Sequence, residues 1–281
     1  MHYRLAAIDL DETILAFDGS ISERNRVAVL SLQEAGILPV IASGRMHEAT
    51  VRFADLLNLP GPIISYNGAM IRTRADGALW HHRPIPSYPA ARIVEYCETR
   101  GLHLNYYLED HLYVHEPGRW AEFYVRHTGS PIEPIGDLRQ LDGRAPTKLI
   151  LIDEPDRIIG YQGELDPVFS QDLYITRTNP EYLEFMHPHA NKGTALAILA
   201  ARLGIDRSEV LAFGDGANDL PMLQWAGLSI AMGNGRQEVR DVASVVAPPF
   251  DRDGFAVAVE GILADGSSGP DRVWLDEGRI G

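Results

Sequence analysis

The sequence predicts an α/β protein whose parallel β-sheet core is interrupted by an inserted α+β segment. Short apolar runs alternate with stretches of helical periodicity at both ends of the chain. After about Pro84 this alternation gives way to a tyrosine-rich series of short runs, and it returns near Asn191. One core formed by two separated parts of the chain is the simplest account of that order.

The first part of the chain is expected to alternate strand and helix. Strands are predicted over residues 5–8, 37–42 and 62–65, because each is a short apolar run followed by polar residues. Ser22 is a good N-cap for a helix that Gly36 ends. A second helix is expected over about residues 47–57. This alternation indicates a parallel sheet with helices on both faces.

The middle of the chain reads as a mostly antiparallel α+β unit. Helices are expected over residues 90–100 and 155–165, and strands over 102–107, 111–114, 148–152, 173–176 and 182–186. Nine of the 11 tyrosines lie between Tyr88 and Tyr182, so the composition changes together with the pattern.

The α/β pattern of the core then returns. Helices are expected over residues 192–203, 220–226 and 237–243, and strands over 210–213, 228–232 and 244–246. We therefore expect a discontinuous core of residues 1–83 and 189–265 and an inserted domain of residues 84–188. Residues 266–281 are rich in glycine and charge and are expected to form a mobile tail.

Composition excludes several classes of protein. The 281 residues include 25 Lys and Arg against 39 Asp and Glu, which gives a formal net charge of −14. Hydrophobic residues make up 45%, so a wholly disordered chain is excluded. The acidic balance argues against non-specific binding to nucleic acid or to an anionic membrane. An anionic substrate would therefore need positive charge supplied locally.

The number of cysteines and the N-terminal residues indicate where in the cell the protein is expected. The single cysteine, Cys97, excludes an internal disulfide and a cysteine-based zinc cluster, and we expect it to be buried and structural. The apolar run at residues 5–8 is too short for a signal peptide, and no segment approaches the roughly 20 apolar residues of a membrane span. We expect a soluble, cytoplasmic protein that binds neither nucleic acid nor membrane.

Polar groups suited to one kind of chemistry follow the predicted core strands. They are Asp9 and Asp11, then Ser43 with Gly44 and Arg45, then Lys192 at a helix start, then Asp215, Asn218 and Asp219 in a glycine-rich loop. Taken alone, each has an ordinary reading as a turn, an N-cap or a solvated side chain. Open α/β sheets collect the ends of their strands in one place, however. The carboxylates would need a cation to coexist at neutral pH, and that cation and Lys192 would supply the local positive charge that phosphoryl transfer requires.

With these motifs in place, the sequence resembles the haloacid dehalogenase (HAD) superfamily, and within it the Cof-like, type IIB sugar-phosphatase branch. The resemblance covers about residues 4 to 260 and rests on four stretches in order: residues 9–13 (DLDET), 41–45 (IASGR), 191–193 (NKG) and 214–219 (GDGAND). Residues 65–69 (SYNGA) and 231–234 (AMGN) also match this branch. The resemblance implies a Rossmann-like HAD core and makes the inserted α+β domain a cap of type C2B.

The resemblance also implies roles for single residues. Asp9 would be the nucleophile, and Asp11 would protonate the leaving alcohol and then activate water. Mg²⁺ would be held by the Asp9 carboxylate, the Asp11 main-chain carbonyl and Asp215, with Asp219 close by. The phosphoryl oxygens would be bound by Ser43 and Lys192. The remaining phosphate-binding or positioning residues would be Gly44, Arg45, Asn67, Gly68 and Asn218.

The expected function is that of a Mg²⁺-dependent phosphatase acting on a small phosphorylated metabolite, with a sugar phosphate as the first choice. A phosphomutase of the same fold and a non-catalytic binding protein are the alternatives. A monomer and a homodimer are not distinguished by the sequence. Glu12 departs from the branch, which usually has glycine there; its side chain either points to solvent, which we favour, or repels acidic substrates at the site mouth. The histidine pair at residues 81–82 reads best as a linker, and the pair at residues 187 and 189 as a linker or a substrate contact in preference to a metal pair.

Overall fold

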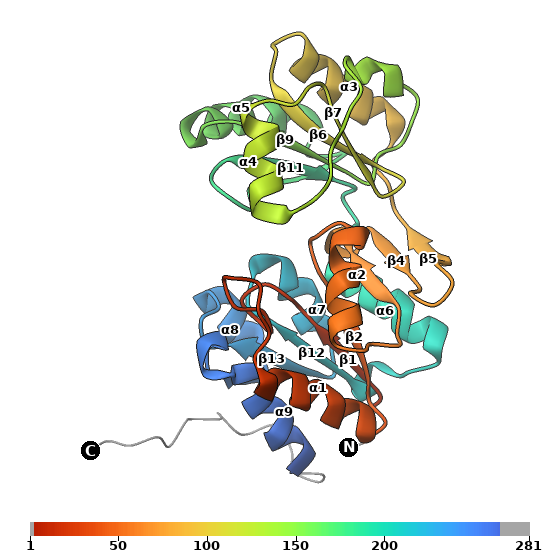
Figure 1. The fold of residues 1–281 in the computed structure, drawn as a ribbon, viewed down its shortest axis with the longest axis vertical. Coiled ribbons are helices and arrows are strands. Elements are labelled where there is room, and N and C mark those ends of the chain that lie inside the picture. The colour runs from red at the N-terminus through yellow and green to blue at the C-terminus, as the bar shows by residue number, and fades with distance from the viewer. Residues whose placement is uncertain (1–2, 265–281) are drawn as a thin grey trace, which may run out of the picture. The chain divides into compact units, whose positions relative to one another are not determined.

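The computed structural model describes residues 3–264. By its internal contacts the chain divides into two compact units (Figure 1). The first comprises the residues up to Arg45, Thr50–His81 and the chain from Asn191 onward. The second comprises Met46–Ala49 and His82–Ala190. The expected tail over 266–281 lies outside the described residues.

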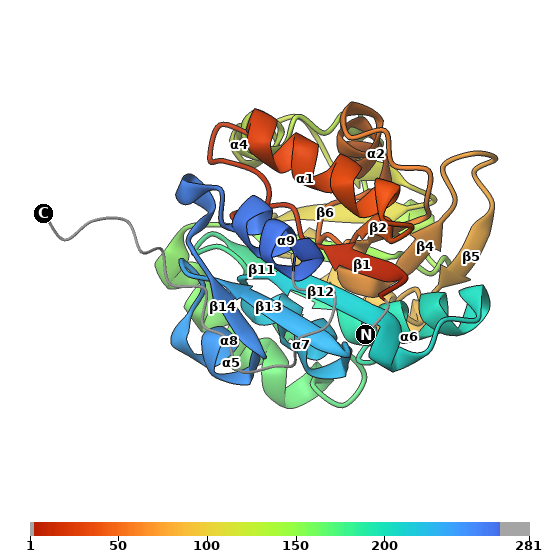
Figure 2. The ribbon, with the colours of Figure 1, turned by 90° about the horizontal axis from the view of Figure 1, so that it is seen from below.

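A five-stranded parallel sheet forms the centre of the first unit, and its order is β14-β13-β12-β1-β2 (Figure 2). The strands are β1 (Leu5–Ile8), β2 (Leu38–Ile41), β12 (Val210–Gly214), β13 (Leu228–Met232) and β14 (Val245–Ala247). Ile8 lies beside Phe213 on one neighbour and beside Ile41 on the other. The carboxyl ends of β1, β2 and β12 therefore lie level with one another.

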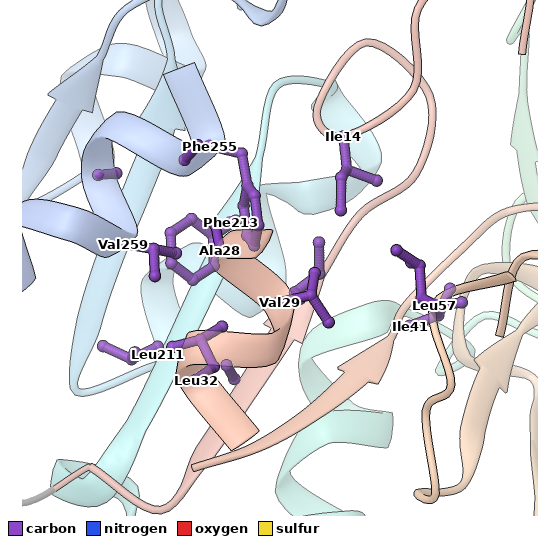
Figure 3. Packing of buried hydrophobic residues seen from close by; sticks show 14 of the residues in the cluster. Ile14, Ala28, Val29, Leu32, Ile41, Leu57, Leu211, Phe213, Phe255 and Val259 are labelled. Atoms are coloured by element: carbon purple, nitrogen blue, oxygen red, sulfur yellow. The ribbon is translucent and has the colours of Figure 1, made fainter. Parts of the chain in front are cut away.

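Helices cover both faces of this sheet. One face packs against α1 (Glu23–Glu34), α2 (His47–Leu56) and α9 (Gly254–Ala264). The other face packs against α6 (Lys192–Leu203), α7 (Leu220–Trp225) and α8 (Gln237–Val242). On the first face Val29 of α1 and Phe255 of α9 lie in one apolar cluster with Phe213 of the sheet (Figure 3). These buried side chains are the main source of the unit's stability.

Capping residues mark the starts and ends of core helices. The Ser22 hydroxyl accepts a hydrogen bond from the Asn25 N–H at the start of α1. The Asn191 side chain does the same for the Thr194 N–H at the start of α6, and Gly204 ends that helix in the left-handed region at φ +64°. The Asn191 cap fixes the position of Lys192, the first residue of α6.

The third predicted strand is not part of the main sheet. β3 (Ile63–Ser65) pairs antiparallel with β4 (Met70–Arg72) in a three-stranded sheet completed by β5 (Leu79–His82). An isolated parallel bridge between Ala42 and Ile64, with a hydrogen bond from the Ser43 N–H to the Ile64 carbonyl, links β3 to the residues that follow β2. The expectation that residues 62–65 join the parallel sheet is corrected accordingly. His81 and His82 belong to β5 rather than to a free linker.

The second unit is an α+β domain with a six-stranded sheet of order β10-β11-β9-β6-β7-β8. Its strands are β6 (His103–Leu108), β7 (His111–Val114), β8 (Glu133–Pro134), β9 (Lys148–Ile152), β10 (Tyr174–Thr176) and β11 (Tyr182–Met186). All pairs are antiparallel except β7 with β8. Its helices are α3 (Ser87–Glu98), α4 (Arg119–Thr128) and α5 (Pro155–Phe169). Cys97 is buried in this unit's core, and burial raises the pKa of its thiol, in keeping with a structural role.

Short 3₁₀ turns complete the structure: η1 (Tyr66–Gly68), η2 (Leu138–Leu141), η3 (Arg207–Glu209), η4 (Ala217–Asp219) and η5 (Phe250–Arg252). The predicted fold class, an α/β core with an inserted α+β unit, is confirmed. Five helices and strands were not anticipated from the sequence, namely β4, β5, β8, α4 and α9. None of the described helices is long and apolar enough to cross a membrane.

Candidate active site

The candidate site lies where four core strands end. Asp9 follows β1, Ser43 follows β2 after one residue, Asp215 follows β12 and Asn234 comes two residues after β13. In a parallel sheet these ends share one edge, so the side chains that follow them converge. Lys192 reaches the same place from the first turn of α6.

Lys192 and two carboxylates form a buried ion triad. The Lys192 Nζ atom lies 2.5 Å from Asp9 Oδ1 and 2.6 Å from Asp219 Oδ1. Lys192 and Asp219 have no exposed surface, and Asp9 has almost none. Burial alone would lower the pKa of Lys192, but the two carboxylates more than offset this and raise it, so the side chain stays protonated. Burial and the charge of Asp219 raise the pKa of Asp9 well above its usual range, and Lys192 opposes this only in part.

Asp219 also organises the loop that follows β12. Its Oδ2 atom accepts hydrogen bonds from the backbone N–H groups of Asp215 and Gly216, at 3.0 and 2.9 Å. A Cβ atom at Gly214 would lie 2.6 Å from the Asp219 side chain, so the loop can fold over this carboxylate only with glycine there. Both Asp219 oxygens are thus engaged within the protein.

Asp215 is held beside the triad by two neutral side chains. The Thr13 hydroxyl donates to its Oδ1 atom at 3.2 Å, and Asn234 Nδ2 donates to its Oδ2 atom at 3.3 Å. Burial raises the pKa of Asp215 to about 7, and the charges of Asp219 and Glu12 act in the same direction. The structure thus brings two groups to the site, Thr13 and Asn234, that the sequence analysis did not assign to it. The place of Asn234 after a core strand, within a Gly-Asn-Gly sequence, is the signal that could have found it.

The donor set fits a divalent cation. Asp9, Asp215 and Asp219 each offer a carboxylate oxygen, and these oxygens lie within 4.8 Å of one another. Three carboxylates face one lysine; burial first, and then the charge of Asp219, raise the pKa values of Asp9 and Asp215. Oxygen ligands of this kind suit a hard ion such as Mg²⁺. The expected metal residues Asp9, Asp215 and Asp219 are therefore together, whereas the Asp11 side chain is not in this group.

Asp11 and Glu12 turn away from the buried cluster. β1 ends at Ile8, and the N–H groups of Thr13, Ile14 and Leu15 fold back onto the Leu10 carbonyl. Side chains two residues apart share one side only while a strand continues, and β1 ends before Asp9. Instead, the Asp11 carboxylate is 54% exposed and pairs with Arg45, and Glu12 is exposed with φ +55°.

The expected phosphate-binding loop is held by close contacts of the Asn67 side chain. Asn218 Nδ2 donates to Asn67 Oδ1 at 2.9 Å, and Tyr66 and Asn67 both have φ of +51°. A Cβ atom at Gly44 would lie 2.7 Å from Asn67 Oδ1, so glycine is required there. The structure therefore brings Gly44, Asn67 and Asn218 together. Ser43 is fully buried, and its hydroxyl oxygen accepts from the Arg45 N–H at 3.2 Å.

The histidine pair at residues 187 and 189 lies in the second unit. The His189 N–H donates to His187 Nδ1, and the two ring centroids are 5.6 Å apart. Burial, Arg83 and His189 lower the pKa of His187. This contact is local, in keeping with the expected linker.

The chain is similar along most of its length to several known proteins. Bacillus subtilis has a 5-amino-6-(5-phospho-D-ribitylamino)uracil phosphatase, YitU, that is 27% identical over 259 residues, which are 90% of this chain and 94% of YitU. The crystal structure of TM0651 from Thermotoga maritima is 30% identical with a TM-score of 0.86, over 95% of this chain and 99% of that one. The subclass IIB sugar phosphatase BT4131 shares the fold, with 21% identity and a TM-score of 0.80 over 92% of this chain and 98% of that one.

The family assignment rests on nearly the whole chain. The sequence profile described as haloacid dehalogenase-like hydrolase matches residues 6–259, which include both parts of the core and the second unit. The expectations of an enzyme and of this superfamily are therefore confirmed. The chain belongs to the haloacid dehalogenase-like hydrolase family.

Proposed function

We propose that this protein is a Mg²⁺-dependent phosphatase that hydrolyses a small phosphorylated metabolite through an aspartyl-phosphate intermediate. The observation that carries the proposal is the buried Lys192, whose ammonium group bridges Asp9 and Asp219 with Asp215 alongside. Such a set of fixed charges can hold a phosphoryl group and offset the charge of its transition state. The phosphatase names of relatives along most of the chain support the same reaction class.

In the first half-reaction Asp9 is the nucleophile. Lys192 holds its Oδ1 atom, so Oδ2 is the oxygen that attacks phosphorus, and the bond from phosphorus to the leaving oxygen breaks. Asp11 donates a proton to that oxygen, and the alcohol leaves. In the second half-reaction Asp11 takes a proton from water, the water oxygen attacks phosphorus, and the bond to Asp9 breaks to release inorganic phosphate.

The cation would be held by the carboxylates of Asp9 and Asp215 and by the main-chain carbonyl of Asp11. Asp219 would lie close to the cation without being a main ligand, because its oxygens already accept hydrogen bonds from Lys192 and the loop N–H groups. When bound, the ion supplies charge compensation for the phosphoryl oxygens. Lys192, Ser43, Asn218 and the backbone at Asn67 and Gly68 would bind and orient these oxygens.

The substrate class follows from the relatives and from the inserted unit. One relative is named for a phosphorylated ribityl compound, which makes a sugar or polyol phosphate the first choice for this chain. We propose a core of residues 1–83 and 189–265 and a cap of residues 84–188 that contributes to the choice of leaving group. The single cysteine fits a reducing compartment such as the cytoplasm, and the net charge of −14 argues against binding to nucleic acid or an anionic membrane.

The test is inorganic phosphate release from a panel of sugar phosphates, nucleotides and pyridoxal phosphate, with Mg²⁺ and with EDTA. We expect metal-dependent release that the Asp9→Asn variant lacks, although this variant keeps its fold and its size. Absence of release from every member of the panel by folded, Mg²⁺-loaded protein would overturn the proposal. Release that requires a bisphosphate activator would point to a phosphomutase instead.

A further inference from the structure

We propose that Glu12 is a specificity-determining residue: its carboxylate makes the site favour phosphate esters whose leaving group is neutral or cationic over esters that carry a second negative charge. This inference rests on the proposed phosphatase function and extends it to the substrate's charge. It is carried by the backbone conformation of Glu12, its lack of a partner and its place beside Asp215.

The backbone at Glu12 is in a conformation that favours glycine. Its φ is +55°, in the left-handed region that residues with long side chains adopt rarely. The conformation is held in place because Asn234 Nδ2 donates to the Glu12 carbonyl oxygen at 3.0 Å. Asn234 also donates to Asp215, so the Glu12 backbone is fixed to a residue of the site. A charged side chain at a position that disfavours any side chain calls for a role of its own.

The Glu12 carboxylate is an unbalanced negative charge. It is exposed and forms no ion pair with any residue between 3 and 264. Two cations of the site are already engaged, Arg45 by Asp11 and Lys192 by Asp9 and Asp219. Glu12 nevertheless lies at the site, because Asn234 Nδ2 donates both to its carbonyl oxygen and to Asp215.

This place distinguishes Glu12 from the metal-binding carboxylates. It is not among the three acids whose oxygens lie within 4.8 Å of one another. A phosphoryl group would meet the charge of Lys192 and of the bound cation, but a second anionic group would extend outward, toward the exposed Asp11 and Glu12. There it would meet the Glu12 carboxylate, which forms no ion pair with any residue between 3 and 264. Two unit charges roughly 7 Å apart in a partly solvated site change binding by a factor of the order of ten.

The experiment compares three small esters that differ only in the charge of the far end. They are phosphoethanolamine, 2-hydroxyethyl phosphate and 2-phosphoglycolate. The ratio of kcat/KM for the cationic ester to that for the anionic one is measured in the Mg²⁺-loaded wild type and in Glu12→Gln. The control is Glu34→Gln, which removes the same charge from an exposed position at the end of α1.

We expect the ratio to fall about tenfold in Glu12→Gln, to fall less at high salt, and to stay unchanged in Glu34→Gln. A ratio within twofold of the wild type, or an equal change for all three esters, would overturn the inference; the latter would indicate a role in metal binding or folding. Should none of the three esters turn over, the same ratio is taken from their inhibition constants against p-nitrophenyl phosphate. No release from p-nitrophenyl phosphate itself would count against the proposed function rather than against Glu12 alone.

Discussion

The guanidinium group of Arg45 binds both oxygens of the Asp11 carboxylate. Arg45 Nε lies 3.0 Å from Asp11 Oδ2, and a terminal nitrogen lies 2.6 Å from Oδ1. The two residues follow the neighbouring strands β1 and β2, whose parallel register brings them together. This two-point contact fixes the carboxylate plane of the proposed acid more firmly than a single hydrogen bond would.

The first prediction concerns Arg45→Ala. Without the guanidinium, Asp11 is no longer oriented, so proton donation to the leaving oxygen becomes less efficient. We expect kcat/KM to fall about tenfold for an alkyl phosphate but less than threefold for p-nitrophenyl phosphate, whose leaving group hardly needs an acid. Arg45→Lys should recover only part of the loss, because an ammonium group cannot make the two-point contact. Stability should change by less than about 1 kcal/mol, since the pair is solvent-exposed.

The control for this prediction is Asp11→Asn, which should show the same dependence on leaving group with a larger loss. An equal loss for both esters in Arg45→Ala would indicate that Arg45 binds the phosphoryl group instead of positioning Asp11. The steady-state kinetics of the three variants on the two esters decide between these roles.

The second prediction concerns the buried triad. Lys192→Met leaves Asp9 and Asp219 as buried neighbours without a counter-charge. We expect the free energy of unfolding in EDTA to fall by about 3–5 kcal/mol, with complete loss of phosphate release. Saturating Mg²⁺ should recover more stability in this variant than in the wild type, because the added cation takes over the missing charge. Urea unfolding with and without Mg²⁺ measures both effects.

The matched control combines Lys192→Met with Asp219→Asn. Removing one of the two orphaned charges should restore part of the lost stability, so the double variant is expected to be more stable than Lys192→Met alone. Equal instability of the single and double variants would show that the lysine contributes by packing, not by charge.

The sequence predicted the core better than its surroundings because core strands and helices carry strong local patterns. The parallel strands and α6 were found almost to the residue. α9 was not, because GFAVAVEGILA is apolar nearly throughout and shows no helical period. α4 was missed because its aromatic residues favour strands in isolation. The partner of β3 depends on contacts distant in sequence, which no local pattern encodes.

The sequence predicted which residues lie in the candidate site better than it predicted which hydrogen bonds they form. Asp9 and Asp215 could be grouped because strand ends in a parallel sheet converge, and Lys192 because it begins a core helix. Asp219 accepts hydrogen bonds from Lys192 with one oxygen and from the loop N–H groups with the other. This arrangement depends on the path of the loop, which the sequence alone does not give. The departure of Asp11 from the cluster depends on β1 ending at Ile8, and helix and strand ends are the least predictable feature of a sequence.

The third prediction concerns pH and metal removal. The pKa of Asp215 is about 7 in the folded chain, against 3.8 for the free carboxyl group. Between about pH 4 and 7 the folded chain therefore keeps a proton that the unfolded chain has released. In EDTA the free energy of unfolding should thus fall as the pH rises through this window, by about 4 kcal/mol at most from this group.

Asp215→Asn should flatten this part of the profile, with Asp9 responsible for what remains. Saturating Mg²⁺ should reverse the slope, because the cation competes with the proton and binds better as the pH rises. Thermal or urea unfolding from pH 4 to 8 measures the profile. The same falling slope in Asp215→Asn would place its origin elsewhere in the molecule.

The last prediction compares two glycines with positive φ in the first unit. Gly68, at φ +94°, faces the start of α6, where an added Cβ atom would lie 2.3 Å from the Asn191 carbonyl oxygen. Gly77, at φ +67°, has no atom within 4 Å of an added Cβ. Gly77→Ala should therefore lower the free energy of unfolding by about 1 kcal/mol, from the backbone preference alone. Gly68→Ala should lower it by about 3 kcal/mol or more.

The two variants should also differ in function. Relief of the Gly68 clash has to move either the loop that carries Asn67 or the cap that positions Lys192, and both belong to the proposed phosphate site. We therefore expect Gly68→Ala to raise KM and lower kcat at a temperature where it is still folded, while Gly77→Ala keeps wild-type kinetics. Unchanged kinetics in folded Gly68→Ala would mean that the close approach of these two segments supports the fold alone and that the loop at Asn67 does not position the phosphoryl group.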